Sequence, residues 1–285
     1  MHSTHGVPLP RRSSSRERQR GAVSVLTGTY RSNERLIVGL LGIAAFFPLW
    51  QLAANLGWIS TLFFSSPIAV VQAGIHEVQT ASFWNDVRLS AFEFAAGYVL
   101  AAVLAVPLGL AIGWYQTLND FLNPWLNFFY SLPRIALAPI IMLWLGIGIG
   151  SIIAIVFLGA FFSVMLNTVH GARIVDRRLV AVTRSFGASE WKTFTTLVVP
   201  SSIPLIVVGL RLGVARAITG VVIGELFASN AGLGHLIVFA SNSLDIDRVL
   251  FAVLFLIVIS VASVEALRRL EARFATWRDD LSTAG

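Results

Sequence analysis

Long runs of apolar residues, separated by short polar stretches, dominate the pattern of this chain. A helix needs about 20 mostly apolar residues to cross a bilayer, and helices satisfy every backbone polar group internally, as lipid demands. Six runs approach or exceed that length, at about residues 36–56, 92–113, 124–146, 150–170, 203–228 and 248–267. The pattern therefore predicts an all-α polytopic membrane protein with six transmembrane spans.

Two prolines, Pro133 and Pro139, interrupt the third run on either side of Arg134. Proline removes a helix hydrogen bond and clashes with the preceding turn. In a membrane such a break is tolerated where the backbone is buried in protein or lines a cavity. These three residues are therefore candidates for a solute pathway, and the alternative is a plain kink near the helix entrance.

The longest connection between runs, at about residues 57–90, contains apolar residues at helix-like spacing. Tryptophan is enriched at membrane–water interfaces. We expect a short interfacial helix before the second span, with Trp58 and Trp84 near the lipid headgroups.

Composition supports a membrane protein, because 56% of the residues are hydrophobic and only 13% are charged. Soluble domains average about 25% charged residues, and one this apolar would expose large aggregating patches. The chain has no cysteine, which excludes disulfides, thiolate metal sites and a cysteine nucleophile.

The net charge of +6 does not indicate nucleic-acid binding, because the basic residues gather between apolar runs. Of 21 lysines and arginines, seven precede the first run, five lie between the fourth and fifth, and four follow the sixth. Cytoplasmic segments carry the excess of basic residues. Both termini and the loop at 171–200 are therefore predicted to be cytoplasmic.

The termini bound the predicted domain. Residues 1–32 are polar and arginine-rich, which predicts a disordered basic cytoplasmic tail. They do not read as a cleavable signal, because the first apolar run is too long for one. A transmembrane domain is expected over 33–278, followed by a short tail at 279–285.

The cytoplasmic loop predicts two short amphipathic helices joined by a glycine turn. Asp176 is a good N-cap and Gly187 a good terminator for the first helix. Between them, Leu179, Val182 and Phe186 share one face at helical spacing.

In the second helix of the loop, Ser189 is the expected cap and Pro200 the expected end, with Trp191, Phe194 and Leu197 on one face. Such a hairpin could lie on the headgroups, with its arginines against anionic lipid. It could equally dock against a cytoplasmic partner. Spacing alone supports both alternatives.

Three charged residues lie within the fifth run: Arg211, Arg216 and Glu225. Ionisable groups in spans are costly and often functional, so either arginine could attract an anionic solute. The alternatives are that Arg211 extends to the interface and that Arg216 pairs with a carboxylate such as Glu93. Glu225 is expected to bond the backbone around residues 232–234.

Glycines recur in the second to fifth runs, and Gly209 and Gly213 form a GxxxG pair. Such pairs permit close helix approach. They predict either packing within the chain or a dimer interface.

The chain lacks the motifs of an energy-converting enzyme. There is no glycine-rich phosphate loop, and the only lysine, Lys192, stands in the wrong context for one. An intramembrane enzyme would need a catalytic pair, yet His170 is seven residues from Ser163, about two turns away. A secondary transporter would predict coupling carboxylates and inverted repeats, for which only Glu93 and Glu225 are candidates.

The cytoplasmic loop resembles the EAA motif of the transmembrane permease subunits of ABC importers. That motif is Glu-Ala-Ala, a glycine four residues later, and Ile-x-Leu-Pro after nine more. Gly187 and Pro200 stand at this spacing, but the opening triplet is Ala181-Val182-Thr183, so the glutamate is absent and one alanine is threonine. The departure would alter one contact with the ATPase and leave the helix–glycine–helix shape. The residues that the resemblance places in this ATPase-coupling loop are Ala181, Val182, Thr183, Phe186, Gly187, Ala188, Glu190, Leu197 and Pro200.

Further stretches, covering about residues 36–278, resemble the branch of this family that imports nitrate, sulfonates and taurine. These stretches are PLGLAIG at 107–113, LPRIALAP at 132–139, LWLGIG at 143–148, FGAS at 186–189, GLRLG at 209–213, GEL at 224–226 and GLG at 232–234.

The resemblance implies a type I importer fold and a permease that forms the translocation pathway for a small anion. It implies a second permease copy, commonly identical, two ATPase subunits that hold ATP and Mg²⁺, and an extracytoplasmic solute-binding protein. No cofactor is expected on this chain, which would sit in a bacterial cytoplasmic (inner) membrane with the Glu225 end near the external gate. The alternative function is an ion-coupled secondary transporter.

Overall fold

The computed structural model describes residues 38, 42 and 44–279, and the side chains of all of these except Arg134 and residues 270–279. The predicted tail at 1–32, part of the first apolar run and residues 280–285 lie outside the described residues. The described chain divides into two units at Pro67. In the first unit, residues 44–55 are helical and a short helix α2 spans Thr61–Phe64.

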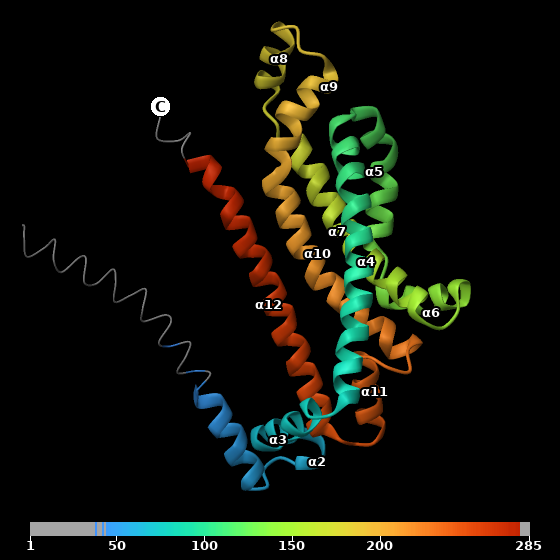
Figure 1. Ribbon diagram of the computed structural model, residues 1–285, viewed down its shortest axis with the longest axis vertical. Coiled ribbons are helices and arrows are strands. Elements are labelled where there is room, and N and C mark those ends of the chain that lie inside the picture. Colours follow the sequence, from blue (N-terminus) through green and yellow to red (C-terminus); the bar gives the residue numbers. More distant parts are fainter. Residues whose placement is uncertain (1–37, 39–41, 43, 280–285) are drawn as a thin grey trace, which may run out of the picture. The chain divides into compact units, whose positions relative to one another are not determined.

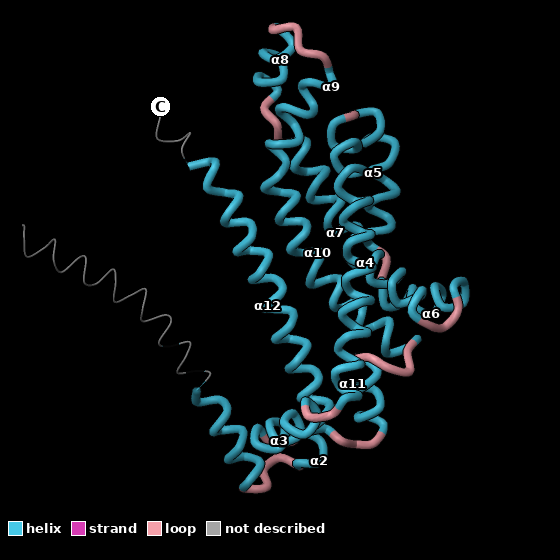
Figure 2. Tube along the Cα trace, in the orientation of Figure 1, coloured by secondary structure: helices cyan, strands magenta, loops and turns pink. Residues whose placement is uncertain are grey.

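The second unit is built from helices joined by short loops, and its described residues include no strand (Figures 1 and 2). Its elements are α3 (Pro67–Val78), α4 (Ala81–Trp114), α5 (Gln116–Ser131), α6 (Arg134–Leu145), α7 (Ile149–Arg173), α8 (Arg177–Ser185), α9 (Glu190–Thr193), a π-helical turn (Phe194–Val198), α10 (Val199–Ala228), α11 (Leu233–Asn242) and α12 (Ile246–Asp279).

Four described helices are long and apolar enough to cross a membrane: Ala81–Trp114, Ile149–Arg173, Glu190–Ala228 and Ile246–Arg269. A fifth span results if α5 and α6 are taken together. The all-α, multi-span prediction is therefore confirmed. Of the six predicted runs, the first lies partly outside the described residues.

The third run is not one straight helix, because α5 and α6 meet at an angle of 101°. Leu132 and Pro133 between them are extended, with ψ angles of 135° and 102°. Proline lacks the N–H needed to continue α5 and disfavours helical backbone in the residue before it. The structure therefore has a break in the helix at Pro133 and not a plain kink, whereas Pro139 lies inside α6.

A separate short helix, α3, precedes the long helix α4, as expected for the connection at 57–90. Helix α4 begins at Ala81 because Thr80 caps it, accepting a hydrogen bond from Phe83 N at 3.2 Å. Trp84 lies in the first turn of α4, and its indole N–H donates to Val78 O at 2.8 Å. Trp58 precedes both helices and is 75% exposed.

The core of the second unit lies where α7 packs between α4 and α10. Small residues permit this approach: Ala101, Ala160 and Ala217 are fully buried. A Cβ added to Gly220 of α10 would lie 2.9 Å from Val156 Cα of α7. In lipid, helices associate through such close packing rather than through the hydrophobic effect.

The GxxxG pair also faces α7 of the same chain. A Cβ at Gly209 would lie 2.8 Å from Asn167 Cβ, and one at Gly213 would lie 2.9 Å from Val164 Cγ2. The structure therefore shows the packing alternative, in which both glycines serve contacts inside the chain.

The α4–α7 contact generates a stability prediction. In Gly109→Ala the new methyl would lie 2.7 Å from Thr168 Cβ and 2.9 Å from Met165 O, so the variant should lose about 1–3 kcal/mol to overpacking. The matched control is Gly150→Ala in α7, which meets no atom within 4 Å. Thermal unfolding in detergent should show a lower midpoint only for Gly109→Ala. Equal shifts for the two variants would contradict this account.

Candidate functional site

The 171–200 loop folds as the predicted helix–glycine–helix hairpin. Asp176 Oδ1 accepts a hydrogen bond from Arg178 N at 2.8 Å and so caps α8. At the other end, Gly187 has a φ of +78° and donates its N–H to Arg184 O at 2.9 Å, while Ala188 N bonds Thr183 O at 3.1 Å. This pair of bonds with a left-handed residue is a Schellman motif, which favours glycine. The predicted cap and terminator are therefore confirmed.

The second helix of the hairpin does not end at Pro200, so that expectation was wrong. Ser189 caps it as expected, accepting from Lys192 N at 3.2 Å. It then continues through the π-helical turn into α10, giving one helix from Glu190 to Ala228. Val199 N bonds Phe194 O in the wider i→i+5 pattern. The backbone hydrogen-bond pattern of the helix thus changes just before Pro200, which has no N–H to donate to an earlier carbonyl.

Side-chain contacts hold the two helices of the hairpin together. Thr193, which is fully buried, donates to Thr183 Oγ1 at 3.4 Å. Thr183 stands where the EAA motif has alanine. An alanine has no hydroxyl, so this hydrogen bond exists only because the chain departs from the motif at this position. Arg184 and Glu190 form an ion pair at 2.8 Å, with 55% and 63% of their side chains exposed. An ion pair so exposed contributes little.

The hairpin carries large apolar side chains that are at least half exposed. Leu179, Val182 and Phe186 are 51%, 50% and 87% exposed, and Trp191 is 71% exposed. The first three share one face of α8, as the spacing predicts. Exposed apolar patches outside a membrane span mark protein or membrane contact sites. Leu197, by contrast, is half-buried.

A cavity of about 360 Å³ opens where the third run breaks. Its lining residues come from α5, the break, α6, α7 and α10, and are Tyr130, Leu132, Pro133, Ile135, Ile155, Gly159, Arg216, Thr219, Gly220 and Ile223. The structure thus brings together two of the pathway candidates, Pro133 and Arg216. The candidates Pro139, Arg211 and Glu225 lie outside this lining, and the side chain of Arg134 is outside the described residues.

Arg216 is the charged residue of this cavity. It is exposed and forms no ion pair within the described part of the chain. The alternative in which Arg216 pairs with Glu93 is not found there: Glu93 is 1% exposed and lies beside Glu225. A guanidinium on the wall of a cavity can bind an anion through paired hydrogen bonds.

A buried polar cluster joins α4, α10 and the start of α11. Glu225 is 1% exposed, and its Oε1 accepts from Ser90 Oγ at 2.5 Å while Oε2 accepts from Gly234 N at 2.5 Å. Ser90 Oγ in turn accepts from Leu233 N at 2.9 Å, and Asp86 Oδ1 accepts from Gly232 N at 2.8 Å. The expected bond from Glu225 to this backbone is confirmed.

Asp86 and Ser90 were missed by the sequence analysis. The signal was present, since residues four apart lie on one face of a helix. Together with Glu225 they satisfy three successive amides at the start of α11, which an uncapped helix leaves without acceptors.

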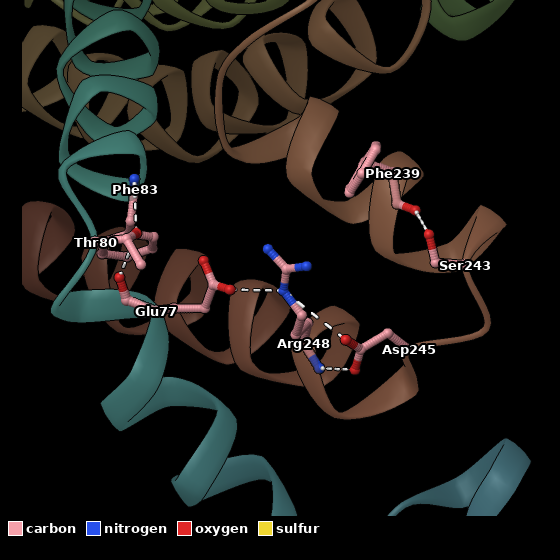
Figure 3. A network of polar contacts seen from close by, with 7 residues as sticks. All are labelled: Glu77, Thr80, Phe83, Phe239, Ser243, Asp245 and Arg248. Carbon is pink, nitrogen blue, oxygen red and sulfur yellow. Dashed lines mark hydrogen bonds and ion pairs between the residues drawn. The ribbon is translucent and has the colours of Figure 1, made fainter.

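A second polar network ties α3 to α12 (Figure 3). Arg248 Nε lies 2.6 Å from Glu77 Oε1, and the Glu77 side chain is 6% exposed. Asp245 caps α12, accepting from Arg248 N at 3.3 Å. Because a carboxylate this buried needs a partner, the pair serves the fold at this end.

Comparison with known proteins identifies the family. A family model described as binding-protein-dependent transport system inner membrane component matches residues 97–276. A putative ABC transporter permease protein of Methanocaldococcus jannaschii is 31% identical, covering 81% of this chain and 88% of the relative. A putative aliphatic sulfonates transport permease protein of Bacillus subtilis is 28% identical, covering 85% and 87%. The taurine transport system permease protein of Escherichia coli is 27% identical, covering 84% and 89%.

Among solved structures, inward-facing MetNI methionine ABC transporter matches with a TM-score of 0.47 and 17% identity, covering 65% of this chain and 94% of that chain. The family assignment rests on the sequence matches. Since the family model spans more than half of the chain, this protein belongs to the binding-protein-dependent transport system inner membrane components, the membrane-spanning permeases of ABC transporters.

Proposed function

We propose that this chain forms the translocation pathway of an ATP-driven importer for a small anion, of the sulfonate, taurine or nitrate kind. Permeases of sulfonate and taurine transport systems are among its relatives. The observation that carries the proposal is one continuous helix, Glu190–Ala228, which joins the exposed hairpin, the Arg216 cavity and the Glu225 cluster.

The anion is proposed from the cavity. Arg216 supplies a positive charge, while most of the remaining lining is apolar. The Thr219 hydroxyl, one turn away, donates to Ala215 O at 2.9 Å. This combination suits a small solute that has an anionic group and little else to bind. Family membership disfavours the alternative, an ion-coupled secondary transporter.

The proposed topology has six crossings with both termini in the cytoplasm. The distribution of arginines supports it. So does the second unit, in which the C-terminal end of α12 lies at the same end as α8 (Figure 1). The hairpin would then face the cytoplasm and the Glu225 cluster the outside.

In the proposed transporter this chain forms a homodimer with a second, identical permease copy. Three further subunits complete the assembly: two ATPases that hold ATP and Mg²⁺, and an extracytoplasmic solute-binding protein. Each ATPase would receive the apolar face of one hairpin. ATP-driven closure would move the hairpins as rigid bodies and switch the cavity between inward- and outward-facing states. With a rise of about 1.5 Å per residue, the Glu190–Ala228 helix reaches about 58 Å, enough to transmit this movement across the bilayer.

The docking proposal predicts that Phe186→Ala weakens ATPase association about 30-fold, the effect of losing an aromatic hot spot of about 2 kcal/mol. The measurement is the amount of ATPase subunit that co-purifies with tagged permease from membranes. Phe121→Ala is the matched control, because Phe121 is also highly exposed, at 70%, but belongs to α5 and not to the hairpin. If the folded wild-type protein brought down no ATPase, the importer proposal itself would fail.

The pathway proposal predicts that Arg216→Gln lowers uptake of the anion at least about 10-fold, because hydrogen bonds to a charged group contribute about 1.5–3 kcal/mol. Arg216→Lys should keep part of the activity, and ATPase co-purification should not change in either variant. The control is Arg88→Gln, an exposed arginine outside the cavity. Uptake at the wild-type rate by Arg216→Gln would exclude the proposed contact.

We also propose that the Glu225 cluster forms part of the external gate. Glu225→Ala should then loosen the start of α11, since Ser90 and Gly234 lose a buried acceptor, at a cost of about 1–3 kcal/mol. Hydrogen exchange at residues 232–236 should quicken by about 5- to 150-fold, and uptake should fall. Asp86→Asn keeps an acceptor oxygen for Gly232 and should change exchange far less. Normal uptake by Glu225→Ala would remove Glu225 from the gate.

A further inference from the structure

A cavity of about 450 Å³ lies beside the hairpin, separate from the one that contains Arg216. It is enclosed by the junction of α4 and α5, the end of α7, and α8 with the first residue of α9. Its lining residues are Gly113, Trp114, Tyr115, Gln116, Ala172, Arg173, Val175, Arg177, Val180, Ala181, Arg184 and Glu190.

The lining side chains carry a net positive charge, with three arginines and one glutamate. Glu190 is paired with Arg184 at 2.8 Å, so it does not neutralise the other two arginines. Arg177 is exposed and forms no ion pair within the described residues. The cavity therefore holds positive charge that the second unit leaves unbalanced.

Arg173 is held in place by neutral groups. Its Nη1 donates to Asn119 Oδ1 at 3.1 Å and its Nη2 to Gln116 Oε1 at 3.4 Å. Asp120 accepts from the amide nitrogens of the same two residues, at 3.2 and 2.8 Å, which turns their carbonyl oxygens toward Arg173. The guanidinium is thus oriented without a direct carboxylate partner.

The cavity lies at the level where the apolar spans end. Trp114 is the last residue of α4 and Arg173 the last of α7. Trp114 and Tyr115 both line the cavity, and such aromatic residues mark the headgroup region of a bilayer. Arginines and aromatic residues therefore meet at membrane-surface depth.

The two faces of α8 are directed differently. Arg177, Val180, Ala181 and Arg184 line the cavity, whereas Leu179, Val182 and Phe186 do not and are at least half exposed. Occupation of the cavity would leave the apolar face free for a protein partner. The lipid and the protein alternatives for this hairpin are therefore compatible, one on each face.

We propose that this cavity binds the phosphate-bearing headgroup of an anionic phospholipid. Guanidinium groups bind phosphate oxygens through paired hydrogen bonds, and basic pockets between transmembrane helices at the cytoplasmic side accept anionic headgroups. The bound headgroup joins α8 to the ends of α4 and α7, and so braces the coupling hairpin. The inference relies on the proposed function only for the cytoplasmic leaflet and for the consequence in transport.

The test measures lipid retained by the full chain, purified with its partners from nanodiscs that mix phosphatidylglycerol and phosphatidylcholine, by native mass spectrometry. The wild type should retain phosphatidylglycerol selectively. Each arginine near a membrane surface contributes about 1 kcal/mol to anionic-lipid binding. Arg177→Gln should therefore weaken retention about fivefold, and the Arg173→Gln, Arg177→Gln double variant about 25-fold. Because Arg177 is exposed and its side chain forms no ion pair within the described residues, Arg177→Gln should fold as the wild type does.

The matched control is Arg178→Gln, an exposed arginine of the same helix that does not line the cavity. It should retain lipid as the wild type does. Equal loss from Arg178→Gln and Arg177→Gln would mean general surface attraction and would overturn the site. Displacement of the lipid by inorganic phosphate would assign the cavity to a free anion and overturn the lipid proposal. ATPase co-purification, measured alongside, reports separately on the proposed function.

Discussion

The close packing of α7 between α4 and α10 is the constraint on which the rest of the second unit depends. Lipid offers helices no hydrophobic gain for associating, so small residues must let the backbones approach. Ala101, Ala160 and Ala217 are fully buried at these contacts. With α10 fixed against α7 in this way, Arg216 reaches the cavity at the helix break, and Glu225 reaches α4 and the start of α11.

The two ends of the second unit use polar groups in opposite ways. Around Glu225, buried acceptors satisfy the first three amides of α11. Around α8, polar and apolar groups are mostly exposed and meet few partners in the chain. This difference fits the proposed roles of the two ends, in which the hairpin contacts the ATPase and the Glu225 cluster faces the outside. The helix from Glu190 to Ala228 connects them.

Sequence reasoning succeeded where local rules decide the structure and failed where tertiary contacts do. The Asp176 cap and the Gly187 terminator depend on neighbouring residues alone, and the structure contains both. The local sequence predicts that the helix ends at Pro200, yet the helix continues past Pro200 through a π-helical turn. The cavity could not be assembled from sequence, because Pro133 and Arg216 come from distant segments that only packing against α7 brings together.

The π-helical turn at Phe194–Val198 also sets the rotation of α10 about its axis relative to the hairpin. A wider turn amounts to one extra residue in the helix, and each residue of an α-helix advances the side-chain direction by about 100°. The turn therefore determines which side of α10 faces the cavity for a given direction of the hairpin. With a regular α-helical turn at these residues, Arg216 would be rotated by about 100° relative to the hairpin and would no longer face the cavity.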